Sequence, residues 1–307
     1  MIDQPAISEL IYSTSQRPES LSALVWKRFK RHRLALLSAG VILLMTILVF
    51  SAPLSRYSAT ELNPANKFAG PSAEHWFGTD ELGRDVFTRI LYGGQISLAV
   101  GIFTTLISLS IGIVIGALSG YYGGWLDNLL MRITDTFLIM PVVFVLILFS
   151  ALLRELPALA NFRSNVWLVI IAISIFAWMW PARITRGLFL VLREKEFVSA
   201  SRALGANDFR LIFLRILPNS IGPLLVSATL EMAYAIITES GLSYLGFGVQ
   251  PPTPSWGNIL ESAQVHVYRA PWLAVFPGLM IFITVIAINF IGDGLRDAFD
   301  PYVVHEK

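Results

Sequence analysis

Residues 193–219 read REKEFVSASRALGANDFRLIFLRILPN, the longest polar stretch between apolar segments in the C-terminal half of the chain. Its acidic residues Glu194 and Glu196 suit the first turn of a helix, where the helix dipole favours negative charge. Gly205 predicts the end of that helix, because glycine adopts the left-handed conformation without steric cost. The first part of the stretch is therefore predicted to be a short helix that ends at a glycine corner.

The second part of the stretch predicts another helix. Asn207 or Asp208 can cap it with a side-chain oxygen, so that the helix begins at Phe209. Pro218 marks the start of the next apolar run, because proline is tolerated at the first position of a helix. The two helices together form a polar hairpin that precedes an apolar segment.

The first helix of this hairpin has a face of small and apolar residues. Ala200, Ala203 and Leu204 are three and four residues apart, a spacing that places them on one side of a helix. Three basic residues accompany them: Arg202, Arg210 and Arg215. Such a hairpin can lie on a membrane surface and insert into a groove on another protein, although an ordinary amphipathic surface hairpin has the same pattern.

The composition excludes a soluble globular domain. Of the 307 residues 55% are hydrophobic and 14% charged, and the mean hydropathy is +0.64. The chain has no cysteine, which excludes disulfides, thiolate metal sites and cysteine nucleophiles. The four histidines are scattered and the net charge is only +2, so the sequence indicates neither a metal site nor a nucleic-acid partner.

Hydropathy predicts six membrane-spanning helices. They cover residues 34–52, 97–119, 131–151, 166–186, 217–240 and 272–292. An even number of spans puts both termini on one side. With the N-terminus in the cytoplasm, the outer segments hold only seven of the 23 Lys and Arg residues. The positive-inside rule therefore predicts that both termini and the hairpin are cytoplasmic.

The spans divide the chain into five parts. The first part, residues 1–33, is a cytoplasmic tail with an interfacial helix, because apolar residues there alternate with Lys and Arg. The other parts are the first span at 34–52, an extracytoplasmic segment at 53–96, a core of five spans at 97–292 that includes a coupling loop at 187–216, and a cytoplasmic tail at 293–307.

Three local patterns predict structure rather than chemistry. In the second span, small residues recur every four positions and allow another helix to approach closely; they are Thr104, Ser108, Gly112, Gly116 and Gly120. Pro141 predicts a kink in the third span. In the outer segment, Thr79 or Asp80 is predicted to cap a helix, with the acids paired to Arg84 and Arg89 rather than bound to a metal.

Two glutamates in the fifth span are candidates for a substrate path. An ionised Glu231 at mid-bilayer costs about 2.5–3.5 kcal/mol, so it should face a cavity or protein rather than lipid. It can line a cavity that attracts a cationic peptide, or be a protonated or paired structural group. Glu239 is predicted to lie at the outer interface. The glycines and prolines of residues 241–254 predict an outer loop above this span.

Three classes of function remain to be compared. An intramembrane aspartyl protease would need Asp135 and Asp293 to face each other, but both lie beside arginines that keep them ionised. A secondary transporter coupled through Glu231 would usually show inverted repeats. The membrane subunit of an ATP-driven importer fits better: the chain has no G-x-x-x-x-G-K-[ST] sequence, and must therefore receive energy from a partner through a docking surface.

Four segments resemble the dipeptide/oligopeptide permease family of bacterial ABC importers, specifically its second, C-type subunit. Three of them are FGTDELGRDVFTRILYGGQISLAVG, GLSYLGFGVQPPTPSWG and FPGLMIFITVIAINFIGDGLRDAFDP. The fourth is the hairpin, which is similar to the family's EAA loop at Ala200, Gly205 and Pro218. It departs from that pattern at Ser199, where the family has glutamate, and at Ser201 and Arg215. The resemblance runs from about Ala23 to Tyr302.

The resemblance implies an all-α membrane protein with six transmembrane helices of the type I ABC importer permease kind and a cytoplasmic EAA-type coupling loop. It implies a non-catalytic subunit of the inner membrane that binds no cofactor, with a homologous B-type permease, two ATPase subunits holding ATP and Mg, and an extracytoplasmic binding protein as partners. The cargo would be di- or oligopeptides, or alternatively nickel or another small solute. The implied coupling residues are Glu196, Ala200, Ser201, Arg202, Ala203, Leu204, Gly205, Ala206 and Asp208.

Overall fold

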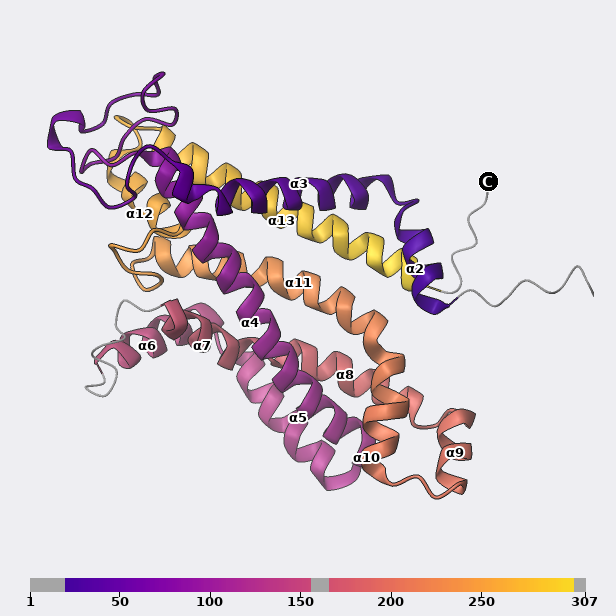
Figure 1. Cartoon of the computed structure of the whole chain (residues 1–307). Coiled ribbons are helices and arrows are strands. Elements are labelled where there is room, and N and C mark those ends of the chain that lie inside the picture. Colours follow the sequence, from indigo (N-terminus) through magenta and orange to yellow (C-terminus); the bar gives the residue numbers. More distant parts are fainter. Residues whose placement is uncertain (1–19, 156–165, 301–307) are drawn as a thin grey trace, which may run out of the picture.

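The computed structural model describes residues 20–155 and 166–300, and this part of the chain is mostly helical, with a long irregular segment between α3 (Arg33–Phe50) and α4 (Val86–Tyr122) (Figure 1). The shorter elements are α2 (Leu21–Phe29), η1 (Ala52–Leu54), η2 (Pro64–Asn66), α9 (Glu196–Ala203), α10 (Asp208–Leu211), the π-helical turn η4 (Ile212–Ile216) and α12 (Trp256–His266). The long helices are α3 (Arg33–Phe50), α4 (Val86–Tyr122), α11 (Leu217–Tyr244) and α13 (Trp272–Phe299). Two bent pairs complete the fold: α5 (Gly124–Ile139) with α6 (Val142–Glu155), and α7 (Val166–Ala177) with α8 (Met179–Leu192).

These helices provide up to six membrane crossings within the described residues. Four are long and apolar enough to cross alone: α3, α4, α13 and the continuous 37-residue run Asp208–Tyr244 that ends with α11. Each bent pair supplies one more if it counts as a single span. The predicted all-α membrane fold is therefore confirmed.

The third predicted span is not one straight helix. Its two halves, α5 and α6, meet at 91°, and Pro141 lies between them. Proline lacks the N–H that a continuing helix requires, so α5 ends before it. The predicted kink is present, and the predicted span at residues 131–151 is divided between two helices. The fourth span is also bent, by 42°, between α7 and α8.

Helix α4 is the centre of the arrangement. It contacts α3, α5, α7, α8, α11 and α12, while α11, α13 and α3 pack beside one another (Figure 1). At one end of the molecule, the fully buried Trp256 of α12 donates its indole N–H to the carbonyl of Ile90 in α4 at 3.0 Å. The opposite end carries α2 and the hairpin of α9 and α10.

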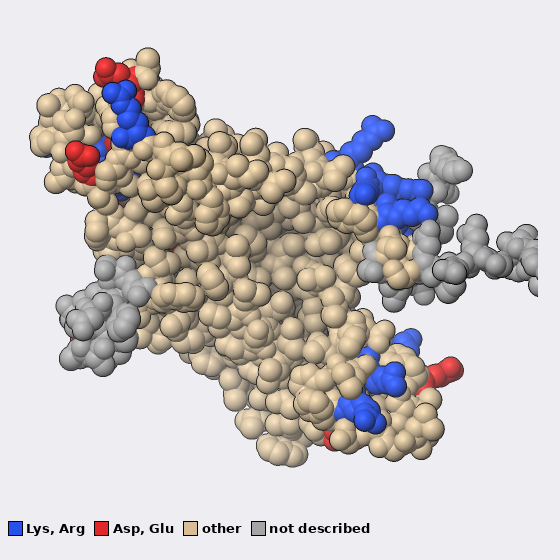
Figure 2. Space-filling model, in the orientation of Figure 1, with Lys and Arg blue, Asp and Glu red and all other residues tan. Residues whose placement is uncertain are grey.

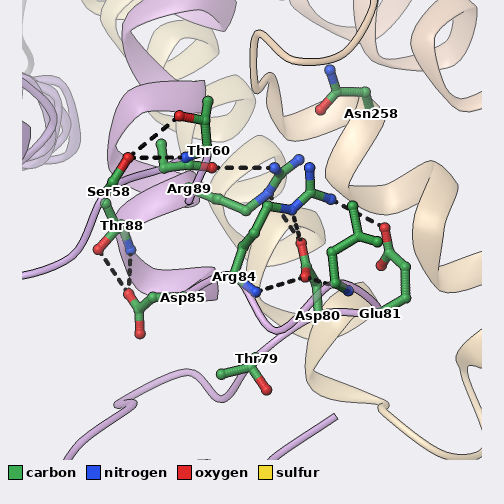
Figure 3. A network of polar contacts seen from close by, with 12 residues as sticks. Ser58, Thr60, Thr79, Asp80, Glu81, Arg84, Asp85, Thr88, Arg89 and Asn258 are labelled. Carbon is green, nitrogen blue, oxygen red and sulfur yellow. Dashed lines mark hydrogen bonds and ion pairs between the residues drawn. The ribbon is translucent and has the colours of Figure 1, made fainter. Parts of the chain in front are cut away.

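The start of α4 differs from the prediction. Asp85, rather than Thr79 or Asp80, caps the helix, and its Oδ2 accepts from the backbone N–H of Thr88 at 2.8 Å (Figure 3). Asp80 is used earlier, because its Oδ1 accepts from the backbone N–H groups of Leu82 and Arg84. The helix consequently begins at Val86, well before the predicted span at residue 97.

The acids of the outer segment pair with arginines, as predicted. Asp80 Oδ2 lies 2.6 Å from Arg84 Nε and 3.5 Å from Arg89 Nε, and all three residues are buried (Figure 3). Arg89 also donates to the carbonyl of Ala59 at 3.4 Å. The network fixes residues between α3 and α4 onto the first turn of α4.

Between α11 and α13 the chain forms a turn and a short helix. Gly241 lies inside α11, contrary to the predicted loop, and the turn comes at Gly246, whose φ is +81°. Ser255 and Asn258 then form a capping box at the start of α12. The loop is therefore shorter than predicted, and α12 packs against α4, α11 and α13.

Charged side chains gather at the two ends of the molecule. In Figure 2 a band without visible Lys, Arg, Asp or Glu separates the mixed charges of the segment between α3 and α4 from the basic patch over α2 and the mixed charges of the hairpin. Such a band is what a bilayer core requires, because charged side chains are costly there.

Candidate functional site

The hairpin of α9 and α10 is built largely as predicted. Gly205 follows α9 with φ +84°, and no heavy atom lies within 4 Å of the position of an added Cβ. The side chain of Asn207 caps α10 by accepting from the N–H of Arg210 at 2.9 Å. Two details differ: the second helix begins at Asp208 rather than Phe209, and Glu194 lies in the turn before α9 instead of in its first turn.

Large apolar side chains project from this hairpin. Leu204, at the glycine corner, is 89% exposed, and Phe209 is 66% exposed. Phe197, Phe213 and Leu214 are also exposed. Several neighbouring apolar side chains left in contact with water mark a site of interaction with another molecule.

The opposite face of the hairpin is packed against the helices beneath it. Val198 and Leu211 are fully buried in one cluster with Phe189 of α8 and Tyr121 of α4. The hairpin is thus seated on the ends of two spanning helices, and its exposed face is presented outward.

The predicted coupling residues occupy this surface. Those with exposed positions are Glu196, Ala200, Arg202, Ala203, Leu204, Gly205 and Asp208. Ser201 and Ala206 are partly buried, and the Ser201 hydroxyl donates to the carbonyl of Phe197 at 2.8 Å.

Two polar connections join the hairpin to α4, and sequence reasoning missed both. The hydroxyl of Tyr121 donates to Asp208 Oδ1 at 2.7 Å. The guanidinium of Arg193 donates to the carbonyls of Gly120 and Tyr121 at 2.8 and 3.1 Å. Asp208 also heads the continuous helical run that becomes α11, so a displacement of the hairpin acts on α4 and α11 together.

The small-residue stripe of α4 faces α8. A Cβ on Gly112 would lie 2.5 Å from Pro181 Cβ, and one on Gly120 would lie 2.7 Å from the carbonyl oxygen of Arg186. A Cβ on Gly116 would overlap the carbonyl oxygen of Ala182. Ser108, on the same stripe, is fully buried. These residues allow backbone-to-backbone contact between α4 and α8.

Two ion pairs brace the same helices. Asp127 in α5 binds the guanidinium of Arg186 in α8 at 2.6 and 2.7 Å, and Asp135 pairs with Arg183. Asp135 is thus held by an arginine, while Asp293 is exposed near the end of α13.

The two glutamates of α11 have different surroundings. Glu239 is fully buried within the protein. Its carboxylate accepts from the hydroxyls of Ser243 at 2.7 Å and Ser97 at 3.3 Å. Ser97 in turn accepts from the backbone N–H of Trp256. Glu239 therefore joins α11 to α4 and, through Ser97, to α12.

Glu231 is also buried, with 7% of its surface exposed, but its Oε1 has no hydrogen-bond partner. It lies among the helices of its own chain, two turns before Glu239. Among the described residues, no group of three or more His, Asp or Glu side chains is arranged to hold a metal ion.

Comparison with known families gives two matches. The model of the binding-protein-dependent transport system inner membrane component matches residues 112–305. The N-terminal transmembrane domain of oligopeptide transport permease C matches residues 20–71.

Individual proteins agree with these matches. A dipeptide transport system permease protein, DppC, of Alkalihalophilus pseudofirmus is 42% identical over 277 residues, 90% of this chain and 88% of the relative. A glutathione transport system permease protein, GsiD, of Escherichia coli is 43% identical over 280 residues, 91% of this chain and 89% of the relative.

Among solved structures, one from the MetNI methionine ABC transporter in inward-facing conformations has a similar fold. The TM-score is 0.56 at 19% identity, and the match covers 68% of this chain and 95% of the other.

Proposed function

This chain belongs to the family of binding-protein-dependent transport system inner membrane components, and from that premise we propose that it carries di- and oligopeptides as one of two permease subunits in an ATP-driven importer. It is a multi-pass inner-membrane protein and a non-catalytic subunit. The proposed cargo follows from relatives named for dipeptide and glutathione transport.

In the proposed assembly this chain lines half of the pathway and a homologous B-type permease lines the rest. Two ATPase subunits bind ATP and Mg, and an extracytoplasmic binding protein delivers the peptide. Both termini and the hairpin lie in the cytoplasm, and the segment before α4 lies outside. The basic patch over α2 supports this orientation, because cytoplasmic loops are rich in Lys and Arg (Figure 2).

The observation that carries the proposal is the exposed face of the hairpin. Leu204 is 89% exposed beside a left-handed Gly205, while the residues beneath are fully packed. A folded corner that holds a leucine in solvent fits a groove on a partner protein. We assign that groove to an ATPase subunit.

Energy then passes from the ATPase to the spanning helices by direct contact. Closure of the ATPase pair displaces the hairpin, and the Tyr121–Asp208 hydrogen bond carries the displacement to α4. The unbroken helical run carries it to α11. The peptide shifts the equilibrium between outward- and inward-facing states only by its difference in affinity for them.

The test is uptake into proteoliposomes that contain the whole transporter, its binding protein and ATP. The substrates are alanyl-phenylalanine, glutathione and nickel ion, supplied separately. We expect ATP-dependent uptake of the first or second. Uptake of nickel alone would replace the peptide assignment, and uptake that needs no ATP would favour a secondary transporter.

The Gly205→Pro variant tests the hairpin itself. Proline cannot adopt φ near +84°, so the corner must refold. We expect ATP hydrolysis to continue without uptake. The control is Gly187→Ala in α8, where an added Cβ also meets no atom within 4 Å and no left-handed conformation is required. Normal uptake by Gly205→Pro would contradict the docking role.

We also propose that Glu231 contributes to the substrate path. Its unpartnered Oε1 supports this, since a buried carboxylate oxygen without a donor is poised to receive one from a bound cation. Glu239 remains a weaker candidate for the path, because its oxygens are occupied by serine hydroxyls.

A further inference from the structure

A groove of about 820 Å³ opens between α2, the start of α11 and the end of α13. Its walls are mainly apolar, with Leu24 and Phe29 on α2, Ile221 on α11 and Phe299 on α13. The groove belongs neither to the hairpin surface nor to the glutamates of α11. Its volume suits a ligand of the size of a small organic molecule or larger.

One basic residue, Arg28 of α2, lines this groove, and four more lie next to it in the sequence at the end of α2 and the start of α3. Five Lys and Arg residues fall within seven positions, and residues 20–33 contain no Asp or Glu. They are Lys27, Arg28, Lys30, Arg31 and Arg33, and all but Arg28 are exposed. Figure 2 shows them as a compact basic patch at this end of the molecule.

Two contacts connect this basic region to the end of α13, which carries aspartates. Asp297 lies 3.6 Å from the imidazole of His32. Arg28, part of the groove wall, donates to the backbone carbonyl of Asp300 at 2.7 Å. That hydrogen bond joins α2 to the residue that follows α13.

Trp26 brings an aromatic ring and a cation together at the groove. It lines the groove and is 56% exposed, and the ammonium of Lys30 lies 5.0 Å from the centre of its ring. Tryptophan and lysine together are typical of the headgroup level of a membrane. The groove therefore joins apolar walls, which suit an acyl chain, to basic residues, which suit a phosphate.

We propose that this groove binds one anionic phospholipid, with acyl chain against the apolar walls and phosphate on the basic residues of α2. Charge complementarity selects the occupant: a zwitterionic or uncharged lipid would fill the walls but leave the basic patch without a counter-charge. Because Pro218 and Pro223 line the same groove, the lipid lies against the first turns of α11, directly after the coupling hairpin.

The test is native mass spectrometry of the full-length chain in its transporter complex, with dioleoyl-phosphatidylglycerol or dioleoyl-phosphatidylcholine added. We expect the anionic lipid to be retained preferentially. The double variant Lys30→Gln/Arg31→Gln should weaken its retention at least about tenfold, since each basic residue near an anionic headgroup contributes several-fold. The matched control Arg56→Gln/Lys67→Gln removes two exposed charges from the segment between α3 and α4, away from the groove and the hairpin, and should retain the lipid normally.

A second pair of variants tests the walls. Ile221→Trp fills the groove and should displace the lipid, whereas Ile237→Trp, on an exposed part of the same helix, should not. Leu24→Trp repeats the test from α2 if Ile221→Trp fails to fold. Equal retention of both lipids would overturn the proposal, as would unchanged retention in Lys30→Gln/Arg31→Gln. Retention that is insensitive to both groove-filling variants would place the lipid on the surface of α2 and also overturn it.

Discussion

The hydroxyl of Tyr121, in the last turn of α4, donates to the carboxylate of Asp208, the first residue of α10, across 2.7 Å. The two residues are 87 positions apart in the chain. Their hydrogen bond is a direct polar link between the proposed docking hairpin and the central helix of the fold. The proposed coupling between ATP hydrolysis and transport can therefore be tested by removing one hydroxyl group.

Tyr121→Phe should weaken coupling while leaving the hairpin in place. The change removes a hydrogen bond to a charged group at a partly exposed position, a loss of about 1.5 kcal/mol. The aromatic ring keeps its packing against Leu211 and Phe189. We expect fewer peptides transported per ATP hydrolysed in proteoliposomes.

Tyr122→Phe is the matched control, because Tyr122 is the exposed neighbour, 51% accessible. Its transport stoichiometry should equal that of the unsubstituted chain. An identical stoichiometry in Tyr121→Phe would remove this hydrogen bond from the account.

Gly116→Ala should destabilise the pairing of α4 with α8. The added Cβ would overlap the carbonyl oxygen of Ala182, and overpacking of this kind costs about 1–3 kcal/mol. We expect a lower unfolding temperature in detergent. Gly40→Ala in α3, where nothing lies within 4 Å of the new Cβ, should not lower it. Equal unfolding temperatures for the two variants would show that the close approach of α4 and α8 is not required.

Glu231→Gln tests the proposed substrate path. The amide keeps the size of the carboxylate and removes its charge, so the apparent affinity for peptides with a cationic side chain should fall while that for neutral peptides is retained. The measurement is competition for uptake between lysyl and alanyl peptides. Unaltered affinity for every cationic peptide would remove Glu231 from the path.

The same substitution at Glu239 gives the comparison. Its carboxylate is occupied by serine hydroxyls inside the chain, and glutamine retains an oxygen that can accept from them. Glu239→Gln should therefore leave the preference between the two peptides unchanged. A selective loss of lysyl peptide uptake in Glu239→Gln would show that this residue, too, faces the substrate.

Several features that depend on one residue and its immediate neighbours in the sequence were predicted correctly. The glycine at 205, the cap at Asn207 and the break at Pro141 are properties of one residue and its neighbours, and each is present. The hydropathy of six segments likewise located the helices that can cross a bilayer, which number six when each bent pair is one span within the described residues.

Features that depend on residues far apart were not predictable. The pairing of Asp80 with Arg84 and Arg89 was predicted, but the Asp85 cap of α4 was not, and Asp85 also contacts His75, ten positions before it. Glu239 is buried because Ser97, 142 positions away, supplies a hydroxyl. The 91° angle between α5 and α6 follows from how the two halves pack on their neighbours, which Pro141 permits but does not set.

The most direct measurement uses the absence of cysteine from the chain. A Leu204→Cys variant carries a single thiol at the most exposed point of the hairpin, and Val265→Cys, at an 82% exposed position of α12, carries one at the other end. In the assembled transporter, a thiol-directed photocrosslinker should join the Leu204→Cys chain to an ATPase subunit and the Val265→Cys chain to none. If Leu204→Cys crosslinks to no subunit, and its thiol reacts with a soluble maleimide as fast in the assembly as in the separate chain, the docking role of the hairpin is contradicted.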